Sequence, residues 1–352
     1  METITIVDTS ISTDNVGDEI IMDAVNEIVM ELFPDAYIFR VPSHDALSER
    51  TRTFVRKSTW CFIGGTNLLS SVINPWNLWR LDKLAANAFG SSRTVCLGTG
   101  WNDYMEPPSA ESKNLLTTAL SSDYLHAVRD KYTQDHLTSI GIRSVFTSCP
   151  TTWFLTPNFC SKISNSKAKT AIITLSAWRA EIELDRAWID VVRKSYDEVF
   201  FFSQMQDDFE YLAALGFDDI KTVAATVQAY DQFLIEHDVD FIGTRLHGGI
   251  RALQKGRRAL ILSIDNRAAE MGRDTGLPVL PRSDPAAIGT WIVGAPPLTI
   301  TLPDNAIASW KRQFSPEARA TATAVSALPE TLPPPPFLKR IKPAAKMILG
   351  RR

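Results

Sequence analysis

The sequence predicts an α/β protein built from two Rossmann-like domains, and three observations support this prediction. Short apolar runs alternate with helical patterns along most of the chain, as in a mostly parallel sheet with helices on both faces. The length of 352 residues exceeds the size at which one core usually stops growing, so two domains are expected. A polar stretch at residues 161–169, rich in Ser, Lys and Asn, interrupts the alternation and is typical of an interdomain linker.

The N-terminal Rossmann-like domain is expected at residues 1–160. Its predicted strands are short apolar runs at residues 3–7, 37–41, 60–63, 93–97, 124–128 and 143–146. A helix is expected at residues 17–33, because Ile20, Ala24 and Ile28 form an apolar stripe at helical spacing, and another at residues 130–139.

The C-terminal Rossmann-like domain is expected at residues 170–300, with a cleft between it and the first. Its predicted strands cover residues 171–175, 198–202, 220–223, 239–242 and 259–263. Its predicted helices cover residues 184–195, 206–215, 227–237, 247–255 and 267–275. A helical segment is expected at residues 301–330, and a proline-rich spacer with a basic amphipathic tail at residues 331–352.

Composition excludes several classes of protein. The net charge of −3 argues against nucleic-acid binding, which needs a basic face. The four cysteines show no metal-ligand spacing, so we expect no metal, and Cys61 and Cys96 are expected to be buried free thiols. The N-terminus lacks a signal-peptide pattern and no apolar run reaches the ~20 residues of a membrane span, so a cytoplasmic location is expected.

The most informative segment runs from residue 239 to residue 250. Arg245 and His247 follow an apolar strand and open a helix, at the position where open α/β sheets bind ligands. A helix N-terminus and a guanidinium attract anions, and a histidine can transfer a proton near neutral pH. The alternatives are a salt bridge for the arginine and a capping role for the histidine. Arg129 also follows a strand, and its alternative is an ion pair with Asp130.

Other strand ends carry weaker signals. Asn15 can cap the first helix, and Gly17 allows close approach of a backbone, although a capped helix start explains both. Gly65 and Asn67 follow another strand, where glycines leave room for a ligand. Residues 176–179 and 203–208 also end strands, so they are candidates to line the cleft, whereas His44, His126, His136 and His237 are expected to be structural.

Taken in order, these segments resemble the polysaccharide pyruvyl transferase family. The resemblance covers roughly residues 4 to 280 and rests on five landmarks: residues 15–18, Gly64-Gly65, Gly98-Thr99-Gly100, Val128-Arg129-Asp130 with Leu137 and Gly141-Ile142, and residues 243–248. It implies a GT-B-like, phosphoenolpyruvate-dependent transferase that adds pyruvyl as a ketal to a sugar of a cell-surface polysaccharide or of its lipid-linked precursor, in exopolysaccharide biosynthesis. No cofactor is implied beyond this donor substrate.

The resemblance implies roles for individual residues. His247 would be the general acid, and the donor would be bound by Arg129 and Arg245, together with Asn15, Gly17, Gly65 and Gly248. Asn67, Trp178 and Arg179 are candidates for acceptor binding. The chain departs from the family pattern at Thr66 in place of a third glycine, at Cys149 in place of an aspartate before Pro150, and at residues 265–267 in place of a lysine.

Two other functions remain open at this level. A GT-B-like cleft also suits a glycosyltransferase with a nucleotide-sugar donor, and a non-catalytic member would only bind a glycan. The tail mixes apolar residues with six basic ones, so it is a candidate for a peripheral contact with an anionic membrane, the alternative being a solvated tail. The sequence does not define the acceptor sugar or the oligomeric state.

Overall fold

The computed structural model describes residues 1–73, 77–294 and 296–319. The chain divides into a unit from Met1 to Gln313 and a second from Phe314 to Arg352. The proline-rich spacer and basic tail at residues 331–352, and residues 320–330 of the helical segment expected at residues 301–330, therefore lie outside the described residues.

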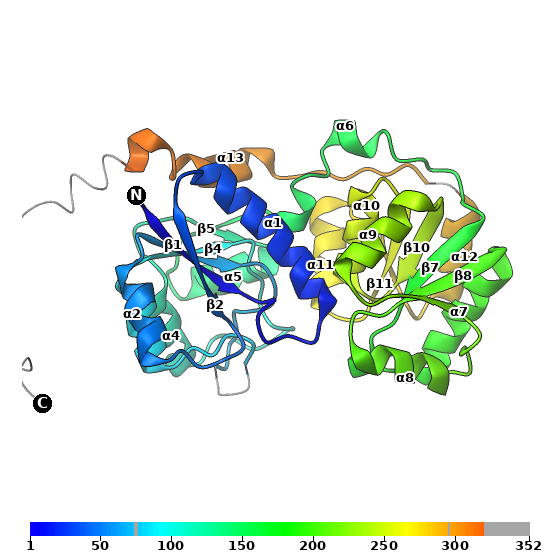
Figure 1. Cartoon of the computed structure of the whole chain (residues 1–352), viewed down its shortest axis with the longest axis horizontal. Helices are drawn as coiled ribbons and strands as arrows, with labels where there is room; N and C mark the ends of the chain where they lie inside the picture. Colours follow the sequence, from blue (N-terminus) through cyan, green and yellow to red (C-terminus); the bar gives the residue numbers. More distant parts are fainter. Residues whose placement is uncertain (74–76, 295, 320–352) are drawn as a thin grey trace, which may run out of the picture. The chain divides into compact units, whose positions relative to one another are not determined.

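The N-terminal half contains a four-stranded parallel sheet with the order β2-β1-β3-β4 (Figure 1). Beside it lies a two-stranded parallel sheet of β5 and β6, and Gly98 N donates to Ala127 O where β4 ends. The strands are β1 (Thr3–Asp8), β2 (Tyr37–Pro42), β3 (Trp60–Gly64), β4 (Arg93–Leu97), β5 (His126–Val128) and β6 (Ser144–Phe146). The helices are α1 (Val16–Leu32), α2 (Glu49–Lys57), α3 (Lys83–Gly90), α4 (Ala110–Ala119), α5 (Lys131–Ser139) and α6 (Pro157–Cys160), with a 3₁₀ turn η1 (Pro150–Thr152).

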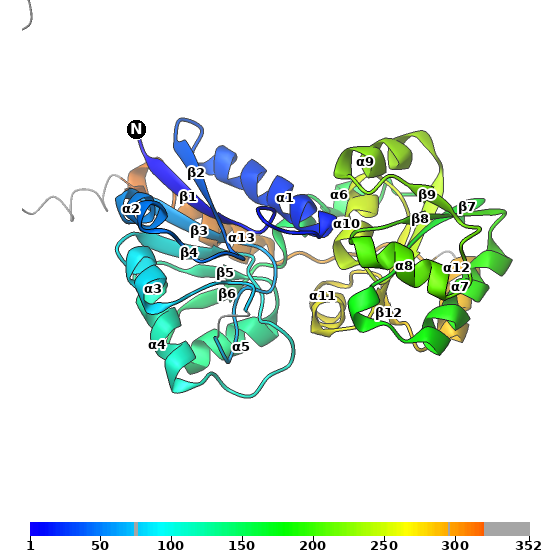
Figure 2. The same cartoon turned by 60° about the horizontal axis from the view of Figure 1, so that its bottom comes forward.

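The C-terminal half contains a six-stranded parallel sheet with the order β12-β11-β10-β7-β8-β9 (Figure 2). Its strands are β7 (Thr170–Thr174), β8 (Glu198–Phe202), β9 (Lys221–Val223), β10 (Val239–Gly243), β11 (Ala259–Ser263) and β12 (Val279–Pro281). Its helices are α7 (Ile182–Ser195), α8 (Gln206–Ala214), α9 (Val227–Glu236), α10 (Leu246–Gln254), α11 (Asn266–Thr275) and α12 (Pro285–Gly294), with a 3₁₀ turn η2 (Ala177–Arg179).

Alternate residues of the C-terminal strands enter two separate cores. Ile173 and Ile242 pack with residues of α7, α8 and α12, whereas Ile172 and Phe241 pack with residues of α9, α10 and α11. Because both faces of the sheet are covered, the central strands β7, β10 and β11 are mostly apolar and almost wholly buried. This is the three-layer arrangement that the sequence predicts, and the parallel sheets of the two halves confirm the α/β class with two Rossmann-like halves.

Helix α13 (Asp304–Arg312) returns to the N-terminal half. Its Trp310 is fully buried and packs edge-on against Phe62 of β3, with ring centroids 6.2 Å apart. Gln313 beside it exchanges hydrogen bonds with the backbone of Leu125. The helical segment expected after residue 300 therefore covers the N-terminal sheet, although it follows the C-terminal half in sequence.

Two further predictions concern the cysteines and membrane-spanning segments. Cys61 and Cys96 are fully buried free thiols, as predicted, and burial raises the pKa of Cys61 to about 11 and of Cys96 to about 12. Within the described ranges, no helix is both long and apolar enough to cross a bilayer. In the same part of the chain, no cluster of His, Cys, Asp and Glu side chains has the grouping of a metal site.

Candidate active site

A cavity of about 450 Å³ lies at the carboxyl ends of the parallel strands. Every wall residue comes from a loop or helix start that follows a strand, in both halves of the chain. This is where parallel α/β sheets bind ligands, because loops and helix N-termini converge there. The walls are formed by Ser12, Thr13, Asp14, Asn15, Asp18, His44, Thr66, Asn67, Leu78, Asn102, Trp178, Met205, Arg245 and Arg267.

The start of α1 forms one wall of this cavity. Asn15 caps the helix by accepting a hydrogen bond from Gly17 N at 3.0 Å, as its position predicts. Gly17 also has a packing role. A Cβ atom there would lie 2.9 Å from Oε1 of Gln204, so the glycine lets α1 approach the loop after β8. Val16 N also donates to Gln204 O at 2.9 Å, which ties the two segments together.

Gly65 and Gly248 are also required by packing. Gly65 has a φ of +56°, and a Cβ atom there would lie 2.2 Å from Cγ2 of Ile21 on α1. At Gly248 in α10, a Cβ atom would lie 2.7 Å from Nε2 of Gln204. Neither glycine is a wall residue of the cavity. A side chain at either position would therefore meet protein atoms, and donor binding by these two glycines stays a prediction.

Arg129 is completely buried directly behind the cavity wall. Its Nε donates to Asp130 at 2.9 Å, so the ion pair considered as the alternative is present, and its Nη1 donates to Asn67. Its Nη2 has no hydrogen-bond partner among the described residues. Because an unpaired buried donor is costly, this guanidinium is prepared to bind an oxygen atom of a ligand.

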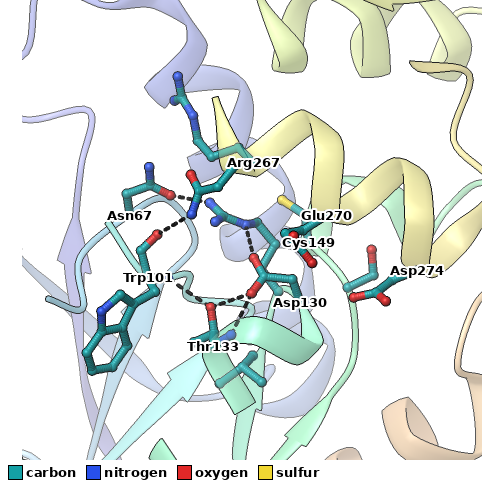
Figure 3. A network of polar contacts seen from close by, with 12 residues as sticks. Asn67, Trp101, Asp130, Thr133, Cys149, Arg267, Glu270 and Asp274 are labelled. Carbon is teal, nitrogen blue, oxygen red and sulfur yellow. Dashed lines mark hydrogen bonds and ion pairs between the residues drawn. The ribbon is translucent and has the colours of Figure 1, made fainter. Parts of the chain in front are cut away.

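The surroundings of Arg129 hold it in one position. Asp130 caps α5 and accepts hydrogen bonds from the amide and hydroxyl of Thr133 at 2.7 and 2.6 Å (Figure 3). A Cβ atom on Gly100 would lie 2.2 Å from Cζ of Arg129, so only glycine fits at that turn. Among the predicted acceptor residues, Asn67 both contacts Arg129 through its side chain and lines the cavity.

Arg245 lies at the start of α10, lines the cavity and has different partners. Its Nη2 donates to both carboxylate oxygens of Asp208 at 2.5 Å, and its Nε donates to Leu175 O at 2.7 Å. The salt bridge considered as its alternative is therefore present, but it is buried rather than at the surface. Asp208 belongs to the 203–208 segment that the sequence placed near the cleft.

His247 lies in the first turn of α10, and its side chain is buried. Its Nε2 is 3.7 Å from Sγ of Cys149, the residue that precedes η1. Burial, followed by the positive charges of Arg267 and Arg129, lowers the pKa of His247 to about 3. The imidazole is therefore neutral at pH 7 in the free protein. A bound anion would raise this pKa, because it stabilises the protonated form.

Arg267 is a cavity residue to which the sequence analysis assigned no role. It sits in the first turn of α11, and its Nε and Nη2 both donate to Oδ2 of Asp265, at 2.9 and 2.6 Å. Its position after β11 repeats that of Arg245 after β10, which is the signal that could have identified it. The region that replaces the family's lysine thus still supplies a cation to the cavity.

Trp178 and Arg179 lie on the 3₁₀ turn after β7. Trp178 is 47% exposed and lines the cavity, with the guanidinium of Arg267 5.4 Å from its ring centre. Arg179 is not a wall residue and instead forms an ion pair with Asp103 at 2.7 Å. Of the three candidate acceptor residues, the cavity therefore includes Asn67 and Trp178.

His44 was expected to be structural, but it lines the cavity. It follows β2, and the helix expected near it begins only at Glu49, after the capping residue Ser48. A second cavity, of about 560 Å³, shares His44 and extends past Arg80 and Leu115 on the N-terminal half. His44 therefore lines both cavities.

Comparisons with known proteins identify a family. A family model for polysaccharide pyruvyl transferase matches residues 15–266. No curated protein matched the sequence. A UDP-N-acetylglucosamine 2-epimerase from Rickettsia bellii is 11% identical, with a TM-score of 0.45 over 93% of this chain and 96% of that chain. An O-GlcNAc transferase mutant from Thermobaculum terrenum is 13% identical, with a TM-score of 0.43 over 92% of this chain and 65% of that chain. Such low TM-scores support no conclusion about substrate or mechanism.

Proposed function

The chain belongs to the polysaccharide pyruvyl transferase family, and on this premise we propose that it transfers pyruvyl from phosphoenolpyruvate to a sugar as a ketal. The observation that supports this donor best is the unpaired Nη2 of the fully buried Arg129. Phosphoenolpyruvate carries a carboxylate and a phosphate, and an oxygen of either group satisfies a guanidinium donor. We place that oxygen behind Asn67, beside His247.

The arginines of the site suit a small anion that must be oriented. Arg129, Arg245 and Arg267 each pair with one carboxylate, from Asp130, Asp208 and Asp265 respectively. Each ion pair fixes its guanidinium before the donor arrives, so less rotamer entropy is lost on binding. The donor is then recognised by directed hydrogen bonds and by the N-terminus of α10, which bears a partial positive charge.

The reaction needs a proton at C3 of the donor. Protonation of C3 turns the methylene into a methyl group and leaves an electron-poor C2, which two hydroxyls of one sugar attack in turn. The C2–O bond to phosphate breaks with its electron pair, and inorganic phosphate departs. One hydroxyl proton replaces the proton used at C3, and the other leaves with phosphate, so the step balances without a cofactor.

We assign the C3 proton to His247, which the charges of Arg129 and Arg267 keep neutral in the free protein. The bound donor brings negative charge to the same place and raises the histidine pKa, so that the imidazole takes up a proton only in the complex. A positioned general acid of this kind contributes ~10²–10⁴-fold to the rate. Asn67 and Trp178 are the proposed acceptor contacts in the cavity, with Arg179 at its margin.

The test is incubation of the whole protein with phosphoenolpyruvate and a panel of saccharides, with release of inorganic phosphate as the readout. Acceptor-dependent phosphate release, with a ketal methyl signal in the product's proton spectrum, is the expected result. Release of a nucleotide from a panel of nucleotide sugars would instead establish the glycosyltransferase alternative. Saccharide binding without release of either would establish a non-catalytic member.

We also propose that the protein works in the cytoplasm, loosely held at the inner face of the membrane by its basic tail when the acceptor is a lipid-linked saccharide. The argument is compositional: residues 337–352 contain six basic and no acidic residues, interleaved with apolar ones. Sedimentation with anionic vesicles should recover the full chain in the pellet and lose a chain that ends at Glu330.

A further inference from the structure

A buried carboxylate faces the same cavity and has no part in the mechanism above. Asp18 lies in the first turn of α1, is 6% exposed and is a wall residue. Its Oδ2 accepts a hydrogen bond from Oγ1 of Thr13 at 2.9 Å, which orients it within the loop after β1. The carboxylate thus reaches the cavity from the N-terminal half, in the wall that also contains Asn15.

The groups that face Asp18 come from three elements. His44, on the loop after β2, has its Nε2 4.0 Å from Oδ2 of Asp18. That Nε2 lies 3.2 Å from Thr9 O, and because a carbonyl only accepts, this ring nitrogen carries a proton. Arg267, at the start of α11, brings a positive charge near Asp18, and Asp14, on the same loop as Thr13, lines the cavity as well. Asp18 therefore faces His44 and Arg267 but, unlike Asp208, has no bidentate arginine partner.

We propose that Asp18 is the general base that accepts the proton of the attacking acceptor hydroxyl. The inference rests on the proposed function and completes it, since ketal formation releases two hydroxyl protons and the assigned acid supplies only the C3 proton. In the first attack, the hydroxyl O–H bond breaks, its electron pair forms the bond to C2, and the proton moves to Oδ of Asp18. Asp18 then returns the proton to the departing phosphate.

The position of Asp18 suits this role better than a purely structural one. Trp178 and Arg267 lie in the walls of the same cavity, so a sugar ring stacked on Trp178 would bring its hydroxyls into the space that Asp18 faces. Burial raises the pKa of Asp18 to about 6, against weaker lowering by Thr13, His44 and Arg267. A base whose pKa lies near the working pH is the most effective, because it is ionised and still basic.

The experiment is chemical rescue of the full-length Asp18→Ala variant by formate, with acceptor-dependent phosphate release as the readout. Formate fits the space left by the deleted carboxylate and supplies a carboxylate base from solution. We expect Asp18→Ala and Asp18→Asn to lower kcat by ~10²–10⁴-fold, and formate to restore part of the rate in Asp18→Ala but not in Asp18→Asn, where the amide fills the space. Chloride at equal ionic strength should restore nothing.

The matched control is Glu19→Ala, which removes the neighbouring exposed carboxylate from the same first turn of α1. It should keep the wild-type rate, because Glu19 does not line the cavity. Calorimetry with phosphoenolpyruvate alone should show donor binding retained in Asp18→Asn, and thermal unfolding should show that both Asp18 variants fold.

Three outcomes decide the inference. Formate rescue confined to Asp18→Ala supports Asp18 as the base. Near-wild-type kcat in Asp18→Asn, or an equal loss in Asp18→Ala that formate does not relieve, overturns the inference while leaving the proposed function standing. Absence of donor binding and of phosphate release in the wild-type protein overturns the proposed function, and the inference with it.

Discussion

Arg129 and Arg245 begin from the same sequence signal and end in different states. Each follows a parallel strand, each is buried and each pairs with a carboxylate. Arg245 uses its Nε and Nη2 on Asp208 and Leu175 O. Arg129 donates one hydrogen bond to Asp130 and one to Asn67, and its Nη2 has no partner in the described part of the chain. An arginine after a strand thus indicates an anion site, but the N–H donors that its protein partners leave unpaired decide how many hydrogen bonds it can give to a ligand.

The same comparison explains His247. In sequence it lies two residues after Arg245, yet the positive charges that lower its pKa come from Arg267 and Arg129. Burial is the largest cause of this low pKa, and of the two charges Arg267 lies in the same half of the chain as His247 and Arg129 in the other. Four predictions test the proposed roles of these residues.

The largest effect on kcat is expected from substitution of His247, the proposed general acid. His247→Gln should lower kcat by ~10²–10⁴-fold, because the proton donor is lost. Donor affinity should change little, since the arginines keep their counter-ions. Steady-state phosphate release and calorimetry with phosphoenolpyruvate measure the two quantities. Turnover within threefold of wild type would show that another group protonates C3.

The next effect separates the two arginines through lysine variants, which leave each buried carboxylate with a cation. Arg129→Lys should weaken donor binding by roughly tenfold or more, because a charge-assisted hydrogen bond is worth ~1.5–3 kcal/mol and lysine lacks the second arm of the guanidinium. Arg245→Lys should change donor affinity less and thermal stability more, because the bidentate contact with Asp208 is lost.

Calorimetry and thermal unfolding of both lysine variants distinguish these patterns. Equal losses of affinity would mean that Arg245 releases Asp208 to bind the donor. A greater loss of affinity in Arg245→Lys would reverse the assignment.

A third prediction concerns Cys149, which replaces the aspartate of the family pattern. Cys149→Asp should raise the pKa of His247 from about 3 by at least ~1 unit, because a carboxylate then lies near Nε2 in place of a neutral thiol. Cys149→Ser, which adds no charge, is the control. Nuclear magnetic resonance titration of the imidazole reads the shift. An unchanged pKa in Cys149→Asp would mean that Arg129 neutralises the new carboxylate instead.

The smallest effect concerns stability against pH. The pKa of His247 is lowered by burial to about 3, so between pH 6 and pH 4 the unfolded state binds a proton that the folded state does not. Stability therefore falls as the pH falls, by ~1.4 kcal/mol per pH unit for one such group. His126, whose pKa burial lowers to about 4, acts in the same direction, and Asp18, whose pKa is raised to about 6, acts in the opposite one.

His247→Gln removes one histidine from this balance. Its unfolding free energy, measured with denaturant at pH 6, 5 and 4, should fall less steeply than that of the wild type. The difference in slope should be ~1.4 kcal/mol per pH unit. Identical slopes would show that His247 titrates in the folded protein near its ordinary pKa.

Much of the fold follows from local patterns. Continuous apolar runs such as Val239–Gly243 identify strands because both faces of these sheets are covered. The stripe of Ile20, Ala24 and Ile28 identifies α1 for the same physical reason, burial of one face. The pattern fails where burial is slight. Helix α2 (Glu49–Lys57) buries only Val55, so no stripe predicts it, and three-residue β12 is too short to give a signal.

The sequence by itself determined the α/β class, the strand ends and the chemistry available at each of them, because these depend on burial and spacing along the chain. Only the tertiary structure decided which of those strand ends meet. It joined Arg245 to Asp208, placed Gln204 where Gly17 leaves room, and brought Asp18 and His44 to the cavity. Such contacts depend on strand order and helix packing, which bring together residues far apart in the chain, and no local pattern encodes them.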